Sequence, residues 1–149
     1  MGGLLRERGG RVRSHVIGAD RVSGQQIGKI LRANVAKSAH LNTDESPIYT
    51  TPGKDFASHE TVNHKAEEYA RTDTVTGRVV STNAAEGYFG NSKRSLDGTH
   101  HSVSRKYLPL YMAELDHKYN TRKVTDGERT VLGIGKAAGK RLTLKPVKD

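Results

Sequence analysis

Two arms flank a pair of glycines within the first 17 residues, and apolar and polar positions alternate along the second arm. One arm covers residues 4–8, and the other covers residues 11–17 and places Val12 on the opposite side from Arg13. A period of two residues is typical of a half-buried β-strand, and glycines between two such arms favour a tight turn. The pattern therefore predicts an antiparallel hairpin that turns at Gly9-Gly10.

The spacing then changes to that of a helix. In residues 25–35 the apolar positions recur every three or four residues, which predicts a helix. Residues 39–43 form a short candidate strand that delivers Asp44 at its end, and residues 61–63 form another. Prolines and glycine between them predict a loop or a broken helix.

A second helix is predicted after residues 71–81, a polar stretch that we expect to be irregular. Thr82 or Asn83 can cap this helix, with Glu86 in its first turn, and it should end near Leu96, before Gly98.

Ser104 can cap a third helix, which carries an apolar stripe at helical spacing, and Pro109 fits its first turn. The stripe consists of Leu108, Tyr111, Leu115 and Tyr119. Residues 126–149 are predicted to be a basic tail that can contain a short helix. A hairpin followed by alternating helices and strands predicts an α/β or α+β domain with a mixed sheet.

The net charge of the chain says more about its partner than its length does. The chain of 149 residues is long enough for one domain with a modest core, and 34% of its residues are apolar. Its 25 Lys and Arg exceed its 16 Asp and Glu, which gives a formal net charge of +9. A basic balance of this size favours a polyanion, most often nucleic acid. A basic protein without a specific partner is the alternative.

Several classes of protein are excluded because the sequence lacks the features that define them. No run of 18 apolar residues is present, so no membrane partner is expected, and the start does not resemble a signal peptide. The absence of cysteine leaves no disulfide framework and no thiolate metal site. We therefore expect a cytoplasmic protein.

Two carboxylates are the candidates for chemistry. Asp44 at a strand end and Glu86 on a helix, flanked by basic residues, suit metal-assisted phosphodiester chemistry. Glu86 and Lys93 are seven residues apart and share one helix face. On that face Glu86 could hold a metal cation, and Lys93 could hold a phosphate. By spacing alone, a solvated ion pair is the commoner interpretation of such a pair.

Other motifs rank lower. The histidines at 59, 64, 100 and 101 could form a zinc site, but without cysteine or an evident fourth ligand, packing or phosphate contact is the better interpretation. Residues 133–140 resemble a phosphate-binding loop but have Ile134 in place of its first glycine and Arg141 in place of its Ser or Thr. They are predicted to be part of the flexible basic tail. Tyr107, Tyr111 and Tyr119 could stack on bases, although their helical spacing favours core packing.

Several ordered blocks resemble the DDE-type insertion-sequence transposases called ISXO2-like. The blocks are Arg8-Gly9-Gly10-Arg11-Val12-Arg13, Thr43-Asp44-Glu45, His59-Glu60-Thr61-Val62-Asn63-His64, Thr82-Asn83-Ala84-Ala85-Glu86-Gly87-Tyr88-Phe89, Lys93-Arg94, Gly98-Thr99-His100-His101-Ser102-Val103-Ser104, Tyr119-Asn120-Thr121-Arg122 and Gly139-Lys140-Arg141-Leu142-Thr143. Together they cover nearly the whole chain, and several blocks in order are more specific than any one of them.

The resemblance implies an RNase H-like fold, a mixed sheet flanked by helices, in residues 1–124, with the basic tail in 125–149. It also implies cut-and-join chemistry at the DNA ends of an insertion sequence, with Mg²⁺, or Mn²⁺ as a substitute, held by three acids. Asp44 matches the second acid and Glu86 the third, while Lys93 matches a basic position that contacts DNA. Because of the net charge, we expect Arg94, Arg105, Lys106 and the tail to bind DNA too.

The family's first catalytic Asp lies on a strand upstream of the hairpin, and Asp20 cannot replace it by position. We therefore expect an N-terminally truncated, inactive transposase with weak or absent metal binding. The alternative is a non-catalytic DNA-binding protein that interferes with an intact transposase, at its DNA ends or within its oligomer. A homo-oligomer is a further expectation.

Overall fold

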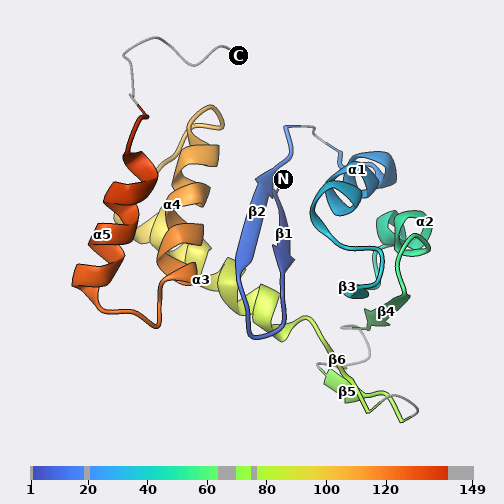
Figure 1. Cartoon of the computed structure of the whole chain (residues 1–149). Helices are drawn as coiled ribbons and strands as arrows, with labels where there is room; N and C mark the ends of the chain where they lie inside the picture. The colour runs from blue at the N-terminus through green and yellow to red at the C-terminus, as the bar shows by residue number, and fades with distance from the viewer. Residues whose placement is uncertain (1, 19–20, 64–69, 75–76, 141–149) are drawn as a thin grey trace. The chain divides into compact units, whose positions relative to one another are not determined.

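The computed structural model describes residues 2–18, 21–63, 70–74 and 77–140, which form two compact units. The central unit is Ile17–Gly90, and the terminal unit combines Gly2–Val16 with Asn91–Asp149. In chain order, the elements are β1 (Gly2–Arg6), β2 (Val12–Val16), α1 (Gly24–Asn34), β3 (His40–Asp44), the 3-10 turn η1 (Pro47–Tyr49), α2 (Thr50–Gly53), β4 (Ser58–Val62), β5 (Ala70–Thr72), β6 (Val79–Ser81), α3 (Asn83–Thr99), α4 (Leu108–Asn120) and α5 (Asp126–Ala137) (Figure 1).

The strands of the described residues form three separate two-stranded sheets. β1 pairs with β2 and β5 with β6, both antiparallel, whereas β3 and β4 run parallel. The α/β class is therefore confirmed, but the predicted single mixed sheet is not what these residues form. Each strand pairs with its nearest neighbour in the chain, and its ladder covers only three to five residues. The RNase H-like arrangement remains a prediction.

The hairpin of the terminal unit confirms the alternating pattern. Its ladder runs from Gly2 opposite Val16 to Arg6 opposite Val12. The N–H of Gly10 donates to the carbonyl of Glu7 at 3.0 Å, so the turn centres on Arg8 and Gly9, one residue earlier than predicted. Gly9 has a φ of 66°, a conformation that glycine adopts without steric cost.

Helix α4 lies along β2 and satisfies its outer edge with side chains. The Val12 N–H donates to Asn120 Oδ1 at 2.7 Å, and Asn120 Nδ2 donates to the Val12 carbonyl at 2.9 Å. Asp116, one turn earlier, accepts from the N–H and the hydroxyl of Ser14 at 2.8 and 2.9 Å. Two side chains on one helix face therefore take the place of a neighbouring strand.

The ends of the helices differ from the predicted ones. α4 begins at Leu108, and Ser104 lies in the preceding turn, where its carbonyl accepts from the N–H groups of Tyr107 and Leu108. Pro109 does lie in the first turn. α3 runs past Gly98 to Thr99, because an exposed glycine weakens a helix without ending it.

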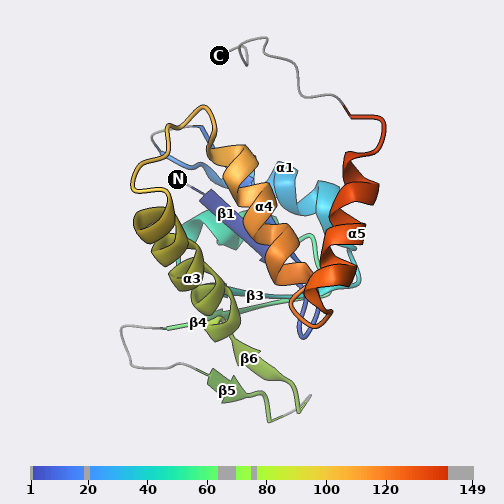
Figure 2. The ribbon, with the colours of Figure 1, turned by 90° about the vertical axis from the view of Figure 1, so that its left-hand side faces the viewer.

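Residues 126–137 form a regular helix, in the stretch that was predicted to be a basic tail with a possible short helix. Thr125 and Glu128 make a capping box: the Thr125 side chain accepts from the Glu128 N–H, and the Glu128 carboxylate accepts from the Thr125 N–H. The glycine-rich stretch from Gly133 to Ala137 is therefore helical, which rules out a phosphate-binding loop there. Residues 141–149 lie outside the described part. α4 and α5 lie side by side in Figure 2, joined by a short turn.

The central unit packs helix α1 beside η1 and α2. Ser23 caps α1 in a capping box with Gln26, and Ile27 and Leu31 bury the apolar face of the helix, as its spacing predicted. Further buried side chains of the unit are Phe56, Val62, Val80 and Tyr88. β5 and β6 form a hairpin where residues 71–81 were predicted to be irregular.

Candidate functional site

Asp44 lies where a site at a strand end requires it. It is the last residue of β3, its side chain is exposed, and its Oδ1 accepts from the N–H of Ser46 at 3.1 Å. The carboxyl ends of parallel strands are the usual place for ligand sites in α/β proteins. Burial raises the pKa of Tyr49, and the negative charge of Asp44 raises it further, so the phenol lies within the field of this carboxylate.

The residues beside Asp44 fix the end of its strand. The Thr43 hydroxyl donates to the Asp44 carbonyl at 2.8 Å and lies 2.8 Å from Nε2 of His59 on β4. Since the single hydroxyl hydrogen is already used, Nε2 must donate, which fixes the tautomer of His59. The imidazole also packs against Gly53, where a Cβ atom would collide with it. His59 is therefore a packing residue, as the sequence favoured, and its partner Thr43 was not predicted.

Glu86 lies in the first turn of α3, directly after β6. Its side chain is exposed, and Oε1 accepts from the Thr82 hydroxyl at 2.7 Å. The Thr82 carbonyl accepts from the Glu86 N–H, so Thr82 rather than Asn83 precedes the first helical turn. A carboxylate in the first turn is also stabilised by the helix dipole.

Asp44 and Glu86 belong to the same unit. β6, the strand that leads into α3, contacts both β3 and β4. The fold therefore places β6, the strand that leads into the helix of Glu86, next to the strand pair that carries Asp44. Among the residues that the structure describes, no group of three His, Cys, Asp or Glu could hold a metal ion. This result gives no support to a zinc site at His59, His100 and His101, and His64 lies outside the described residues.

The four predicted DNA-binding cations all lie in the terminal unit. Lys93 and Arg94 project from the exposed side of α3, and Arg94 donates to Asn91 Oδ1 at 2.6 Å. Arg105 is exposed and Lys106 half-buried in the segment that leads into α4.

The net positive charge of the chain is confined to this unit. Its sequence contains 17 Lys and Arg against 7 Asp and Glu, a balance of +10. The remaining residues contain 8 Lys and Arg against 9 Asp and Glu, a balance of −1. The sequence alone did not indicate this division, because the terminal unit combines the two ends of the chain. The two candidate metal ligands belong to the central unit, and the four candidate cations belong to the terminal unit.

The tyrosines have partners within the fold. The Tyr119 ring faces two guanidinium groups, those of Arg6 at 5.6 Å and Arg122 at 4.1 Å, measured to the ring centroid. Tyr111 meets His100 edge to face at 4.6 Å. These contacts support packing for both rings, whereas Tyr107 is 46% exposed.

Two histidines make stability depend on pH. Burial lowers the pKa of His59, and this effect outweighs the carboxylate of Glu60, which raises it. Burial and the positive charge of Arg13 lower the pKa of His15, and they outweigh Asp116, which raises it. A histidine with a lowered folded-state pKa stabilises the fold above its unfolded-state pKa of about 6.5, and this stability is lost as pH falls through the folded value.

We therefore expect the free energy of unfolding to fall between about pH 7.5 and pH 5.5, a window that spans the unfolded-state pKa of histidine and lies above those of most carboxyls. Urea titrations at the two ends of this pH window measure the fall in the free energy of unfolding. His59→Gln should reduce the fall, whereas His101→Gln, at an exposed position, should not. Equal falls in wild type and His59→Gln would contradict the assignment to His59.

Comparison with known families gives one match. The family model of the ISXO2-like transposase domain matches residues 4–120. These residues include both candidate carboxylates and all four candidate cations. No curated protein and no solved structure matches the chain. None of the described helices is both long and apolar enough to span a membrane.

Proposed function

Because the chain belongs to the ISXO2-like transposase domain family, we propose that it acts in DNA cut-and-join phosphoryl transfer at insertion-sequence ends. The match over residues 4–120 carries this proposal, since it covers most of the chain and every candidate residue. The difference in charge between the two units supports separate roles for them. The terminal unit would hold DNA, and the central unit would supply the carboxylates.

Asp44 and Glu86 would hold the Mg²⁺ ions, with Mn²⁺ as a substitute. When bound, two such ions activate the attacking oxygen and stabilise the leaving oxygen. Carboxylate oxygens are the ligands that these hard cations prefer, and both side chains are exposed to an incoming ion. The Thr82 hydroxyl orients Glu86, and the Thr43–His59 pair holds the strand end that carries Asp44.

Two carboxylates are fewer than a two-metal site needs. The described residues contain no group of three His, Cys, Asp or Glu that could hold a metal ion. We therefore propose that the 149-residue chain by itself binds these cations weakly and does not join DNA ends. The barrier depends on aligning the attacking and leaving oxygens, which one loosely held ion does not do.

A non-catalytic role is the second candidate, and the charge of +10 in one unit supports the DNA binding that it requires. Phosphate contacts need no metal ion, so the chain could occupy insertion-sequence ends without cutting them. In that role it would compete with an intact transposase for the same DNA. Both candidates share the DNA interface and differ only in catalysis.

A strand-transfer assay with a labelled DNA end, in Mg²⁺ and then in Mn²⁺, tests the proposed inactivity of the chain. We expect no product from the 149-residue chain. Mn²⁺ titration should show weak binding that Asp44→Asn and Glu86→Gln each abolish, while Asp97→Asn, at an exposed position of α3, leaves it unchanged. Strand transfer that Asp44→Asn abolishes would contradict inactivity. Mn²⁺ binding that survives both substitutions would contradict the metal site.

A further inference from the structure

Two arginines from opposite ends of the chain face one tyrosine ring in the terminal unit. Arg6 is the last residue of β1, and Arg122 follows the end of α4. Their guanidinium carbons lie 5.6 and 4.1 Å from the centroid of the Tyr119 ring, within reach of a cation–π contact. Val12, which lies opposite Arg6 in the hairpin, bonds to Asn120 through its backbone, so the end of the hairpin is held beside the end of α4. We call Arg6, Tyr119 and Arg122 the Tyr119 corner.

Neither guanidinium group of the corner forms an ion pair with a carboxylate of the described residues. Arg122 Nη1 donates to the Tyr119 carbonyl at 2.8 Å, which holds this side chain at the end of its own helix. Arg6 Nε is buried and has no hydrogen-bond partner in the described part of the chain. Because both ring distances end at the same centroid, the two charges lie closer together than the screening length of about 10 Å at 0.1 M salt, and they repel each other. An anion beside both groups would offset this repulsion.

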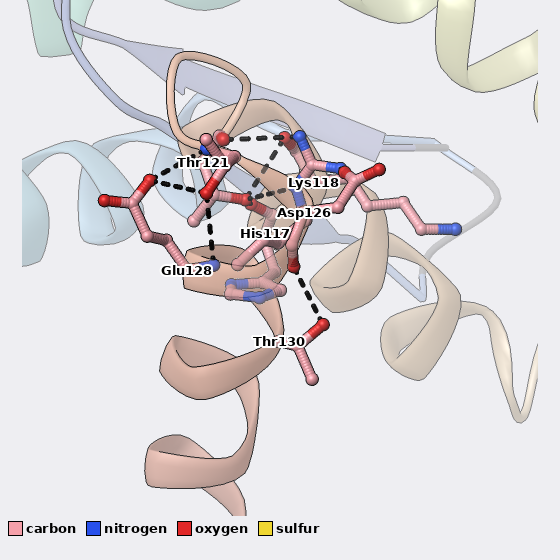
Figure 3. Close-up of polar contacts among 8 residues, drawn as sticks. His117, Lys118, Thr121, Asp126, Glu128 and Thr130 are labelled. Atoms are coloured by element: carbon pink, nitrogen blue, oxygen red, sulfur yellow. Dashed lines mark hydrogen bonds and ion pairs between the residues drawn. The ribbon is translucent and has the colours of Figure 1, made fainter.

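The carboxylates near the corner have other contacts. The Glu7 carboxylate lies against the glycine at the end of its own hairpin turn, and Asp116 accepts from the neighbouring strand. Figure 3 shows the start of α5, the next helix after the corner, where Glu128 accepts from the N–H and the hydroxyl of Thr125 at 2.9 and 2.8 Å. Asp126 pairs with an arginine of the same helix at 2.6 Å. The acids of this region therefore leave the charge of the corner available to a ligand.

Further cations adjoin the corner. Arg11 precedes Val12, and Lys123 follows Arg122. The side chains of Arg11, Arg122 and Lys123 are exposed, and that of Arg6 is half-buried. Arginine suits an anion site of this kind because its planar guanidinium can stack on an aromatic ring and still donate to phosphate oxygens.

We propose that the Tyr119 corner is a second DNA contact, in which Arg6 and Arg122 donate to backbone phosphates of a duplex. This inference rests on the proposed function, since it takes the terminal unit to be the part that holds DNA, and it adds a site to that unit. Stacking on Tyr119 orders both guanidinium groups before DNA binds, which lowers the entropy that binding costs. Phosphate contacts carry no sequence information, so the corner would position the duplex without selecting its sequence.

The corner lies at the far end of α4 from the cations that the sequence predicted. Lys106 lies just before α4 and Arg122 lies after it, and the 13 residues of the helix span about 20 Å. At about 3.4 Å per base pair, this length corresponds to roughly six base pairs of duplex. A duplex that lies along α4 would therefore contact the terminal unit at both ends of this helix.

Fluorescence anisotropy with a labelled duplex of about 16 base pairs, titrated at several salt concentrations, tests the contact. Arg6→Gln with Arg122→Gln should lower the affinity by on the order of tenfold and reduce the salt slope by about 2. Arg6→Lys with Arg122→Lys keeps both charges and should retain the slope. As the control, Arg21→Gln with Lys37→Gln removes the same charge from exposed positions of the central unit and should change neither quantity.

The outcomes separate this proposal from the proposed function. A wild-type chain that does not bind the duplex at low salt would overturn both. Binding that Lys93→Glu with Arg94→Glu weakens, but that Arg6→Gln with Arg122→Gln leaves unchanged, would overturn the corner alone. Equal losses from the glutamine pair and from its central-unit control would also overturn it, because total charge would then explain the effect.

A measurement on the wild-type chain keeps the test valid if a variant does not fold, which thermal melts would reveal. The Nε–Hε signals of arginine side chains are followed by NMR while the same duplex is added. Arg6 Nε is buried, which slows the exchange of its proton with water. The signals of Arg6 and Arg122 should shift on binding, and that of Arg21 in the central unit should not. Unchanged Arg6 and Arg122 signals at saturating DNA would overturn the proposal.

Discussion

Replacing Asn120 by leucine is expected to lower the free energy of unfolding of the terminal unit by about 2–4 kcal/mol, since each buried polar group that loses its partner costs about 1–3 kcal/mol. Val12 is 4% exposed, and both its N–H and its carbonyl are bonded to the Asn120 amide. Leucine has the same branched side chain of four heavy atoms as asparagine but offers neither a donor nor an acceptor. Two backbone groups at the edge of β2 would then remain unsatisfied.

Urea denaturation followed by far-UV circular dichroism measures this loss. Asn34→Leu is the matched control, because the Asn34 side chain donates to Ile30 in its own helix and is exposed. Asn120→Asp keeps the acceptor for the Val12 N–H and loses only the donor. Its free energy of unfolding should therefore lie between those of wild type and Asn120→Leu. An Asn120→Leu protein as stable as the Asn34→Leu control would show that α4 does not support β2 in this way.

The role of Asn120 could not be read from its neighbours in the sequence. Asn120 lies in one of the blocks that carry the family resemblance, but its partner Val12 is 108 residues away. The apolar stripe predicted α4 and gave no indication of its polar edge, where Asp116 and Asn120 replace a strand. The pairing exists only once the two ends of the chain meet.

Local signals predicted most of the elements and missed some that were present. The Thr125-x-x-Glu128 capping box precedes α5 in the sequence, yet the glycines and lysines that follow suggested a flexible tail. β5 and β6 are three residues each, too short for a periodic pattern. Asp44 and Glu86 were located through the resemblance, because spacing alone fits an ordinary ion pair or a capped helix start equally well.

The positive charge was visible in the composition, but its location was not. The fold gathers a balance of +10 into the terminal unit and leaves −1 in the rest of the chain. DNA affinity should therefore depend steeply on salt. If the four cations at 93, 94, 105 and 106 each neutralise one phosphate, the slope of log K against log salt is about −3.6, and affinity falls about a hundredfold between 50 and 200 mM salt.

The central claim is that the terminal unit holds DNA, and two double charge reversals test it most directly. Lys93→Glu with Arg94→Glu changes the terminal unit, and Lys29→Glu with Lys37→Glu makes the same change in net charge at exposed positions of the central unit. Fluorescence anisotropy with a labelled duplex, titrated at several salt concentrations, compares them with wild type. We predict that the terminal pair lowers affinity more than tenfold and reduces the salt slope by about 2, while the central pair changes both little. Equal losses from the two pairs would mean that only total charge matters and would contradict the claim.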